Sequence, residues 1–287
     1  MTNPLAEFSK AVAGLVAGAA PSLVSLKSGR SRSTGFAWRP RLIVAADELI
    51  DDDGDELKVT LAGGEEIAGT LVGRDHTTDV ALIRIDRDLP ALAFSNEVPA
   101  AGTLALALGA DAGLPRVTSG VVAYAGAAWR SLRGGTIDAR IELDIALPRT
   151  SEGAPVLDAD GIARGMAVRS RRRTLVIPAA TIARVATTLE TKGYIPRGYL
   201  GLGLHPVKTA TGAGAMVMAV EAGGPGDKAG LHQGDVITGW NGREGAPLHA
   251  IMAALGPDSV GQAVKLKVTL GGTAREVTLT IGERPRP

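Results

Sequence analysis

Side chains that could serve hydrolysis occur at three places in the first two thirds of the chain: Asp47, then His76 and Asp79, then Ser151 and Glu152. A serine nucleophile needs a neighbouring base that accepts its proton near neutral pH, which imidazole does well and a carboxylate does poorly. His76 is the only histidine of the first 200 residues. Any serine chemistry in this part of the chain that relies on imidazole would therefore depend on His76.

The composition excludes several other chemistries. The chain has no cysteine, so disulfides, thiolate zinc sites and cysteine nucleophiles are absent. A net charge of +1 and an aromatic content of 3% argue against a nucleic-acid partner. A serine–lysine dyad has no lysine at a suggestive position, since this part of the chain offers only Lys10, Lys27, Lys58 and Lys192. The acidic run 51–56 lacks the spacing of an EF-hand loop and predicts a turn between strands.

Short apolar runs separated by Gly, Pro and Asp fill residues 22 to about 180, which predicts many short strands in a barrel or sandwich. Residues 57–61 alternate as a half-buried strand should, whereas 80–85 and 103–108 are more continuous and predict buried strands. The run 181–192 has helical periodicity and ends at Gly193, a C-cap signal. We expect a linker at 194–197 and a domain boundary at about residue 196.

The last third has a different pattern. We expect strands at 216–220 and 234–237, a turn at 223–226 followed by a short helical step at 227–229, and a helix at 248–255. Residues 264–270 and 276–281 predict a hairpin around Gly271.

The N-terminal segment contains an apolar run at 11–26, which is too short and too weakly apolar to span a bilayer. Glu7 lies where a signal peptide would be basic, and Pro21 interrupts the run. We therefore expect an amphipathic helix at about 4–18, a first strand at 22–26, and no integral membrane segment. The cytoplasm is the default compartment, with the periplasm as the alternative if the N-terminus is processed.

Segments along nearly the whole chain resemble, in order, the HtrA (Deg) family of trypsin-like serine proteases with a C-terminal PDZ domain. The protease-like segments are Thr34–Phe36, Ala45–Ala46, Thr78–Leu82, Val117–Val122 and Gly153–Pro155. The PDZ-like segments are Arg197–Leu202, Pro225–Ile237 and Asn241–Arg243. The resemblance implies a mainly β chain: a trypsin-like double six-stranded β-barrel with an N-terminal helix at 1–195, and a small α+β PDZ domain at 196–287.

The same resemblance implies a degenerate catalytic triad. Aligned on Gly153-Ala154-Pro155, the position of the serine nucleophile falls on Glu152, the base on Asp47 and the orienting aspartate on Asp79. A carboxylate at the nucleophile position cannot attack as an alkoxide would, and it brings negative charge to where an oxyanion must form. The glycine that shapes the oxyanion hole is matched by Thr150, whose β-branched side chain restricts the backbone.

Two alternatives concern this segment. Ser151 lies next to the nucleophile position, and a one-residue shift of the loop would present it in place of Glu152. Three converging carboxylates could also bind Ca²⁺ or Mg²⁺. We favour neutralisation by arginine or solvent over a metal, with Arg149 and the run Arg169–Arg173 as the candidate partners, and we predict no metal and no cofactor.

The PDZ resemblance implies binding of an extended peptide by strand addition. Its carboxylate would be held by backbone amides of Tyr199-Leu200-Gly201-Leu202, with Arg197 adding charge, and the helix would supply Leu248, Ile251, Met252 and Leu255 as an apolar groove wall. The alternative role of Ile251 and Leu255 is in the core of the domain. His205, His232 and His249 belong to this part and are expected at the surface or groove.

These expectations favour a catalytically inactive HtrA-like pseudoprotease that binds C-terminal or unfolded peptides as an adaptor, scavenger or holdase. The first alternative is an active endopeptidase that uses Ser151. The second is an inactive scaffold subunit that assembles with an active HtrA homologue. The resemblance also implies a homotrimer built by the N-terminal segments, for which Phe8 is the aromatic residue available.

Overall fold

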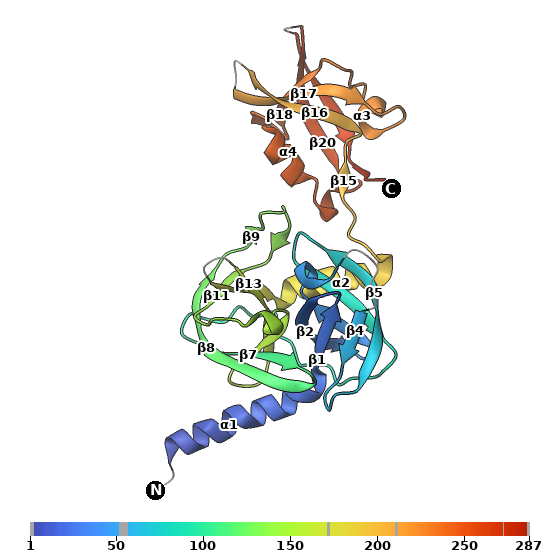
Figure 1. Ribbon diagram of the computed structural model, residues 1–287. Helices are drawn as coiled ribbons and strands as arrows, with labels where there is room; N and C mark the ends of the chain where they lie inside the picture. Colours follow the sequence, from blue (N-terminus) through green and yellow to red (C-terminus); the bar gives the residue numbers. More distant parts are fainter. Residues whose placement is uncertain (1–2, 52–56, 171–172, 210–211, 272, 286–287) are drawn as a thin grey trace. The chain divides into compact units, whose positions relative to one another are not determined.

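The computed structural model describes residues 3–51, 57–170, 173–209, 212–271 and 273–285 (Figure 1). The chain divides into two compact units, Met1–Ile195 and Pro196–Pro287. The acidic run predicted as a turn lies largely outside the described residues, as do Arg171 and Arg172.

The first unit contains two closed six-stranded barrels, so the predicted double barrel is confirmed. In the first barrel, the strand order is β1 (Leu23–Ser28), β2 (Ser31–Arg39), β3 (Leu42–Ala45), β6 (Val80–Ile85), β5 (Glu66–Asp75) and β4 (Leu57–Thr60). In the second, it is β11 (Arg140–Leu143), β14 (Thr174–Pro178), β13 (Ala163–Arg169), β12 (Ala154–Leu157), β7 (Leu104–Asp111) and β8 (Leu114–Gly126). The strands predicted at 57–61, 80–85 and 103–108 are confirmed as β4, β6 and β7.

Each barrel has its own interior, and a third cluster lies between them. Val24, Ile43 and Ile83 belong to the first interior, and Ile141 and Val176 belong to the second. The third cluster joins residues of both barrels to helix α2 (Ala179–Lys192), whose apolar face is buried. This shared core fixes the two barrels against each other and so positions the loops at their junction.

Helix α2 ends as predicted at Gly193, which adopts the left-handed conformation at φ 75°. Its N–H donates to the carbonyl oxygen of Leu189 at 2.8 Å and so satisfies a carbonyl of the last turn.

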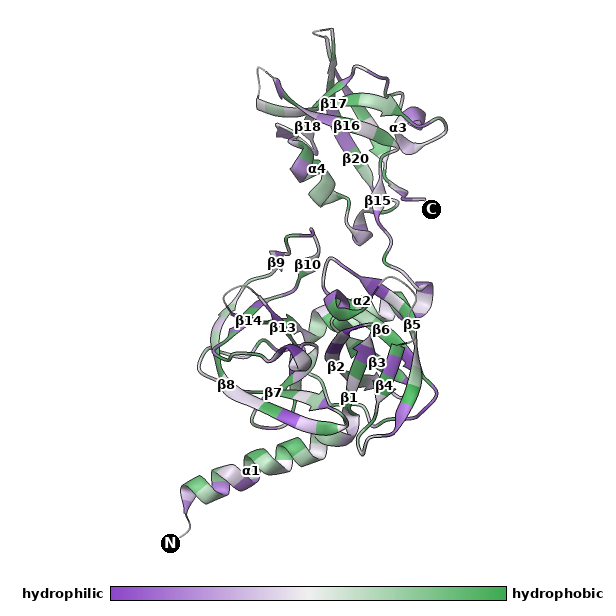
Figure 2. Cartoon of the chain, in the orientation of Figure 1, coloured by the Kyte–Doolittle hydropathy of each residue, from purple (hydrophilic) through white to green (hydrophobic). Residues whose placement is uncertain are grey.

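Helix α1 (Pro4–Ala19) confirms the predicted N-terminal helix. The Asn3 side chain caps it by accepting the N–H of Leu5 at 3.1 Å, and Pro4 occupies the first turn. Ala19 is buried at the C-terminal end of the helix, and Phe8 is 55% exposed. Hydrophobic residues recur along α1 in Figure 2. No helix within the described residues is long and apolar enough to cross a membrane.

The start of β1 differs from the prediction. The strand begins at Leu23 and runs to Ser28, because Ala20–Ser22 form a 3₁₀ turn, η1, with Pro21 in it. Proline fixes φ near −65° and suits the first positions of such a turn rather than a paired strand.

The second unit is built on a sheet with the order β16 (Leu202–Thr209), β17 (Gly212–Val220), β18 (Val236–Trp240), β20 (Ala263–Leu270) and β21 (Thr273–Thr280), with β19 (Arg243–Glu244) beside β18. Helix α4 (Leu248–Ala254) packs against β16. A separate ladder pairs β15 (Gly198–Tyr199) with β22 (Gly282–Glu283). The remaining short elements are η2 (Asp47–Leu49), β9 (Trp129–Arg130), β10 (Thr136–Ile137), η3 (Arg149–Ser151), α3 (Pro225–Lys228) and η4 (Pro257–Ser259).

Several boundaries in this unit differ from the prediction. The strand predicted at 216–220 begins at Gly212, and the strand predicted at 234–237 runs from Val236 to Trp240. The helical step predicted at 227–229 begins at Pro225, since proline is favoured in the first turn of a helix. The second strand of the hairpin begins at Thr273, because Leu270 and Thr273 already pair across the turn.

Candidate functional site

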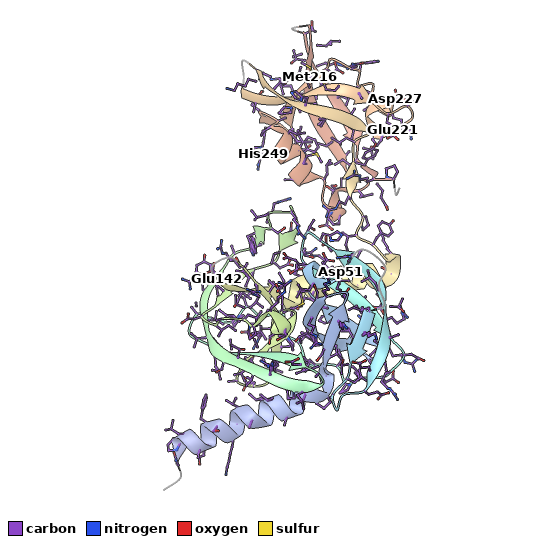
Figure 3. The ribbon with its side chains drawn as sticks, viewed as in Figure 1. Asp51, Glu142, Met216, Glu221, Asp227 and His249 are labelled. Atoms are coloured by element: carbon purple, nitrogen blue, oxygen red, sulfur yellow. The ribbon has the colours of Figure 1, made fainter. Side chains whose placement is uncertain are left out.

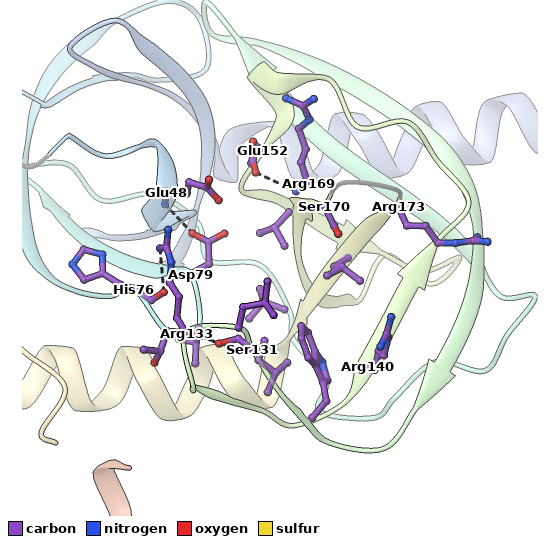
Figure 4. Close-up of a pocket in the computed structure, with 18 of the residues that line it drawn as sticks. Glu48, His76, Asp79, Ser131, Arg133, Arg140, Glu152, Arg169, Ser170 and Arg173 are labelled. Atoms are coloured by element: carbon purple, nitrogen blue, oxygen red, sulfur yellow. Dashed lines mark hydrogen bonds between the residues drawn. The ribbon is translucent and has the colours of Figure 1, made fainter. Parts of the chain in front are cut away.

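A cleft of about 950 Å³ opens in the first unit and is lined from both barrels. Figure 4 shows Glu48, His76 and Asp79 on one side of it and Arg140 and Arg173 on the other. Leu49, Trp129, Ile137, Val168, Leu175 and Ile177 contribute apolar surface. The predicted positions Asp79 and Glu152 both line this cleft.

Asp47 begins η2, directly behind β3, and its side chain is 1% exposed. One carboxylate oxygen accepts a hydrogen bond from the Arg74 side chain, and the other lies 2.6 Å from Nδ1 of His76. Arg74 also donates to the backbone carbonyl oxygens of Asp47 and Ile50, at 3.1 and 2.8 Å. Asp47 is therefore a buried anion that is held by a cation from β5.

This arrangement adds Arg74 to the expected arginine partners. Arg74 holds Asp47, whereas the charges of Arg169 and Arg149 act on Glu152 and lower its pKa. The reason is the sheet order: β5 leads into the loop that faces η2, and this brings Arg74 and His76 to Asp47.

Asp79 precedes β6 and has an unusual backbone conformation for a non-glycine residue, with φ 59°. Its Oδ1 accepts the N–H of Glu48 at 2.8 Å, so the residue caps the start of η2. Burial raises the pKa of Asp79 to about 7 against the opposing effect of that hydrogen bond, and the negative charges of Asp47, Glu152 and Glu48 raise it further. Asp79 is thus close to half-protonated at neutral pH.

Glu152 follows η3 and is 5% exposed. Its Oε1 accepts the backbone N–H of Arg169 at 3.1 Å, drawn as a dashed line in Figure 4. Burial raises the pKa of Glu152 and outweighs the hydrogen bond from Arg169 and the charges of Arg169 and Arg149, which lower it. The cleft therefore contains two carboxyl groups with raised pKa values.

Ser151 is 1% exposed and is not among the described residues that line the cleft. Its Oγ has no hydrogen-bond partner within the described part of the chain. The side chain packs against Gly109 of β7 so closely that a Cβ on Gly109 would lie 2.2 Å from that Oγ. The hydroxyl is thus enclosed by the second barrel, away from the cleft where a nucleophile would act.

The backbone around Ser151 is fixed by local and long-range hydrogen bonds. The N–H of Ser151 donates to Pro148 O at 2.9 Å, and the N–H of Glu152 donates to Arg149 O at 3.2 Å. Thr34, which is fully buried on β2, donates its hydroxyl to Thr150 O at 2.8 Å, and its N–H donates to Glu152 O at 2.9 Å.

Gly153 completes this loop at a position that requires glycine. Its φ is +88°, and a Cβ there would lie 2.2 Å from the carbonyl oxygen of Thr34. The loop before β12 is therefore tied tightly to the first barrel.

No group of three or more histidine or carboxylate side chains within the described ranges is arranged to hold a metal ion. The acidic side chains of the cleft are instead held by Arg74 at Asp47 and by backbone N–H groups at Asp79 and Glu152.

In the second unit, β16 pairs with β17 and forms one edge of the five-strand order. Gly201, which lies between β15 and β16, has φ +65°. Its carbonyl oxygen accepts the N–H of Glu221, and that of Leu200 accepts the N–H of Gly226, at 2.9 and 2.8 Å. These bonds hold the predicted carboxylate-binding loop beside the exposed end of the edge strand.

The side chains of this predicted loop have different surroundings. Leu200 is buried in the core of the second unit, and Leu202 packs against the same core while half-buried. The Tyr199 hydroxyl donates to Glu221 Oε2 at 2.6 Å, and this bond raises the tyrosine pKa. Arg197 is half-buried, and its carbonyl oxygen accepts the N–H of Arg284 at 2.9 Å. Figure 3 labels Glu221 and Asp227 in the second unit.

Helix α4 divides the predicted groove residues. Ile251 and Leu255 are buried in the core, so they follow the alternative core role. Leu248 is half-buried and Met252 is 56% exposed. His249 is exposed on the helix (Figure 3), as are His205 and His232 on their own segments.

Comparisons with known proteins agree with this architecture. Residues 33–166 match the family described as "Trypsin-like peptidase domain", and residues 198–281 match "PDZ domain". A "Probable periplasmic serine endoprotease DegP-like" of Chlamydia pneumoniae is 31% identical over 273 residues, which cover 89% of this chain and 56% of the relative. The corresponding protein of Halomonas elongata is 30% identical, over 89% of this chain and 57% of the relative.

Among solved structures, the crystal structure of the serine endoprotease from Yersinia pestis superimposes with a TM-score of 0.71, at 24% identity over 94% of this chain and 97% of that one. A structure titled "HtrA-type protease AlgW with decapeptide" gives 0.72 at 23% identity, over 96% and 99%. These two likenesses show the fold.

The fold and these matches define a trypsin-like peptidase domain followed by a PDZ domain. The chain is homologous to the DegP-like, HtrA-type serine endoproteases, which confirms the predicted family. It spans about half the length of the curated relatives that it matches.

Sequence reasoning missed Arg74 and the contact of His76 with Asp47. Neither residue carries a motif, and the charge at Arg74 could equally belong to an exposed strand position. Thr34 lies in one of the family segments, but no pattern in the sequence predicts that it ties the 150–153 loop to the first barrel.

Proposed function

We propose that this chain is a catalytically inactive HtrA-like pseudoprotease that binds exposed C-terminal or unfolded peptides through its PDZ domain. The observation that carries the proposal is the environment of Glu152. A buried carboxyl group stands directly before Gly153, where the family resemblance puts the nucleophile, and it is held by the N–H of Arg169. A carboxylate cannot supply the alkoxide that acyl transfer needs.

Two further observations support inactivity. Asp47, the residue aligned with the base, is enclosed between Arg74 and His76. The N–H of Glu152, aligned with an oxyanion-hole donor, is already bonded to Arg149 O. Oxyanion stabilisation requires donors that are aimed at the developing charge rather than at the protein itself.

The alternative of an active endopeptidase that uses Ser151 gains no support from the burial of its hydroxyl. A shift of the 149–153 loop would have to break the Thr34 hydrogen bonds and move Gly153 out of its contact with Thr34. Two partner arrangements also belong to the proposal: a homotrimer, or assembly with an active HtrA homologue.

Peptide binding is supported by the edge position of β16. An extended peptide could add to this strand while its carboxylate meets the N–H groups of Leu200 and Gly201, for which no acceptor is found within the described residues. Leu202, Leu248 and Met252 would contact the peptide side chains.

We propose the periplasm as the compartment of this chain, because the curated relatives are named as periplasmic proteases. These names support the alternative stated for the sequence and give no support to the cytoplasmic default.

Peptide binding is tested by fluorescence anisotropy with labelled apolar decapeptides that differ only in a free or an amidated C-terminus. We expect the full chain to bind the free-carboxylate peptide, and Gly201→Ala to weaken it, because the left-handed backbone needed for the close approach then becomes strained. Gly223→Ala, also at positive φ but with nothing within 4 Å, is the matched control. Equal binding of free and amidated peptides would contradict the proposal.

A further inference from the structure

Two methionines lie on the outer face of the sheet in the second unit, the face turned away from its core. Ala215 and Val217 of β17 are buried in that core. Successive side chains of a strand point to opposite faces, so Met216, which stands between them, points outward. Met218 follows Val217 and is 49% exposed, which places it on the same outer face. Figure 3 labels Met216 in this unit.

His205 of β16 lies opposite Met216 in the strand pair. Leu204 packs against the core, so the next residue, His205, points to the outer face, where it is exposed. His205 and Met216 are direct partners in the antiparallel register. The Cβ atoms of such partners lie about 4.5–5.5 Å apart. The imidazole of His205 and the thioether of Met216 are therefore placed to bind one common ligand.

A β-bulge adds Met218 to this pair. Gly203 pairs with Ala219 and Leu204 pairs with Val217, so Met218 is the extra residue of β17. A bulge bends its strand and changes the direction of a side chain. Gly203 has no side chain and is exposed, which leaves space above the strand pair. Methionine has three rotatable bonds, so its sulfur can adapt to a ligand in that space.

The donor atoms of this group determine which ion it fits. Thioether sulfur is a soft ligand that selects Cu(I), and imidazole also suits copper. The segment 202–220 contains no aspartate or glutamate, so it offers no carboxylate to a hard cation such as Ca²⁺. Zinc is bound by thiolate, imidazole and carboxylate. One imidazole and two thioethers therefore favour a soft monovalent ion.

We propose that His205, Met216 and Met218 form a binding site for one Cu(I) ion on the outer face of the PDZ domain. The ion is held by one imidazole nitrogen and two thioether sulfurs, and it links β16 to β17 at the bulge. This site goes beyond the proposed peptide binding, because it lies on the face opposite the core that Ile251 of α4 joins.

Helix α4 contains a second imidazole–thioether pair, which serves as a matched control. His249 and Met252 are three residues apart on this helix, and both are exposed. Residues at this spacing are neighbours on a helix surface. The helix pair has one thioether where the strand site has two, so it should bind a soft ion more weakly.

The test uses the full chain with Ag(I), a redox-stable ion with the ligand preference of Cu(I), in a chloride-free nitrate buffer. Titration is followed by NMR of the chain labelled with ¹³C at the methionine methyl groups. We expect the signals of Met216 and Met218 to shift first, before that of Met252. Native mass spectrometry should show one tightly bound ion, and Zn²⁺ should bind at least about tenfold more weakly. An anaerobic titration with Cu(I) against bicinchoninate should identify the same site.

The decisive variants remove the ligands of the strand site. Met216→Leu with Met218→Leu should lower the affinity for Ag(I) at least about tenfold, since leucine keeps the apolar volume and removes the sulfur. His205→Gln should lower this affinity in the same direction. His249→Gln with Met252→Leu removes the helix pair and should leave the affinity of the first Ag(I) ion unchanged. Circular dichroism of each variant establishes that it is folded.

Three results would overturn the proposal. One is an unchanged affinity for Ag(I) after both strand methionines are replaced. Another is an equal loss of affinity in the strand and helix variants, which would show that any exposed methionine binds the ion. The third is binding of Zn²⁺ at the same residues as tightly as Ag(I), which would exclude a site selective for a soft ion.

Discussion

The raised pKa of Asp79 predicts how the stability of the first unit depends on pH. The pKa is about 7 in the folded chain and 3.8 for an unperturbed aspartate. The folded state therefore holds this proton more tightly, and the stabilisation from protonation is fully present below about pH 4. It is lost as the pH rises through 7.

The magnitude follows from the size of the shift. A difference of about 3 pH units at 1.36 kcal/mol each gives about 4 kcal/mol as an upper value, and partial relaxation of the site lowers it to about 2 kcal/mol. Asp79→Asn removes the titration, while its amide oxygen can still accept the N–H of Glu48. The variant should match the parent near pH 4 and exceed it by about 2–4 kcal/mol at pH 8.

The assay is urea unfolding at pH 4.5, 6, 7 and 8, followed by tryptophan fluorescence in a Trp240→Phe background. The remaining tryptophans, Trp38 and Trp129, then report on the first unit. A stability difference that stays constant across this pH range would refute the reasoning, as would an Asp79→Asn variant that is less stable than the parent at pH 8.

The other predictions concern the buried ion pair and the 150–153 loop. Arg74→Ala should destabilise the first unit by about 3 kcal/mol in urea unfolding, because it leaves the Asp47 charge buried with only a half-exposed histidine beside it; adding Asp47→Asn should restore part of the loss. If the double variant is no more stable than Arg74→Ala, the pair is not the cause. In thermal unfolding, Gly153→Ala should lower the free energy of unfolding by at least about 2 kcal/mol more than Gly63→Ala does. Both glycines have φ near +90°, but only a Cβ at Gly153 would also clash with Thr34. Equal losses of stability in the two variants would show that the clash with Thr34 does not contribute to the effect.

Much of the fold could be predicted because local patterns and global packing agree. The run Val80–Ile85 is apolar except for Arg84, and it becomes a strand in which every residue but Arg84 is buried. The helix before Gly193 has its apolar face on one side and a C-cap residue at its end. Such signals lie within a few neighbouring residues, so one sequence is enough to find them.

The interior of the site was less predictable, because its contacts cross between distant segments. Arg74 reaches Asp47 only because β5 leads back toward η2, and no periodicity in either segment records that approach. The burial of Ser151 depends on the absence of a side chain at Gly109, which is about 40 positions earlier. Ile251 could equally have faced a groove or a core, and helix position alone does not separate the two.

The central claim is that the chain has a protease fold without protease activity, and the most direct measurement is cleavage of an unfolded protein. Purified full-length chain and its Ser151→Ala variant are incubated with unfolded casein, beside an active HtrA-type protease as the positive control. We predict that casein stays intact with both forms. Glu152 has no alcohol hydroxyl that could act as a nucleophile, and the Ser151 hydroxyl is enclosed. Cleavage by the parent chain that disappears in Ser151→Ala would contradict the account and identify Ser151 as a nucleophile.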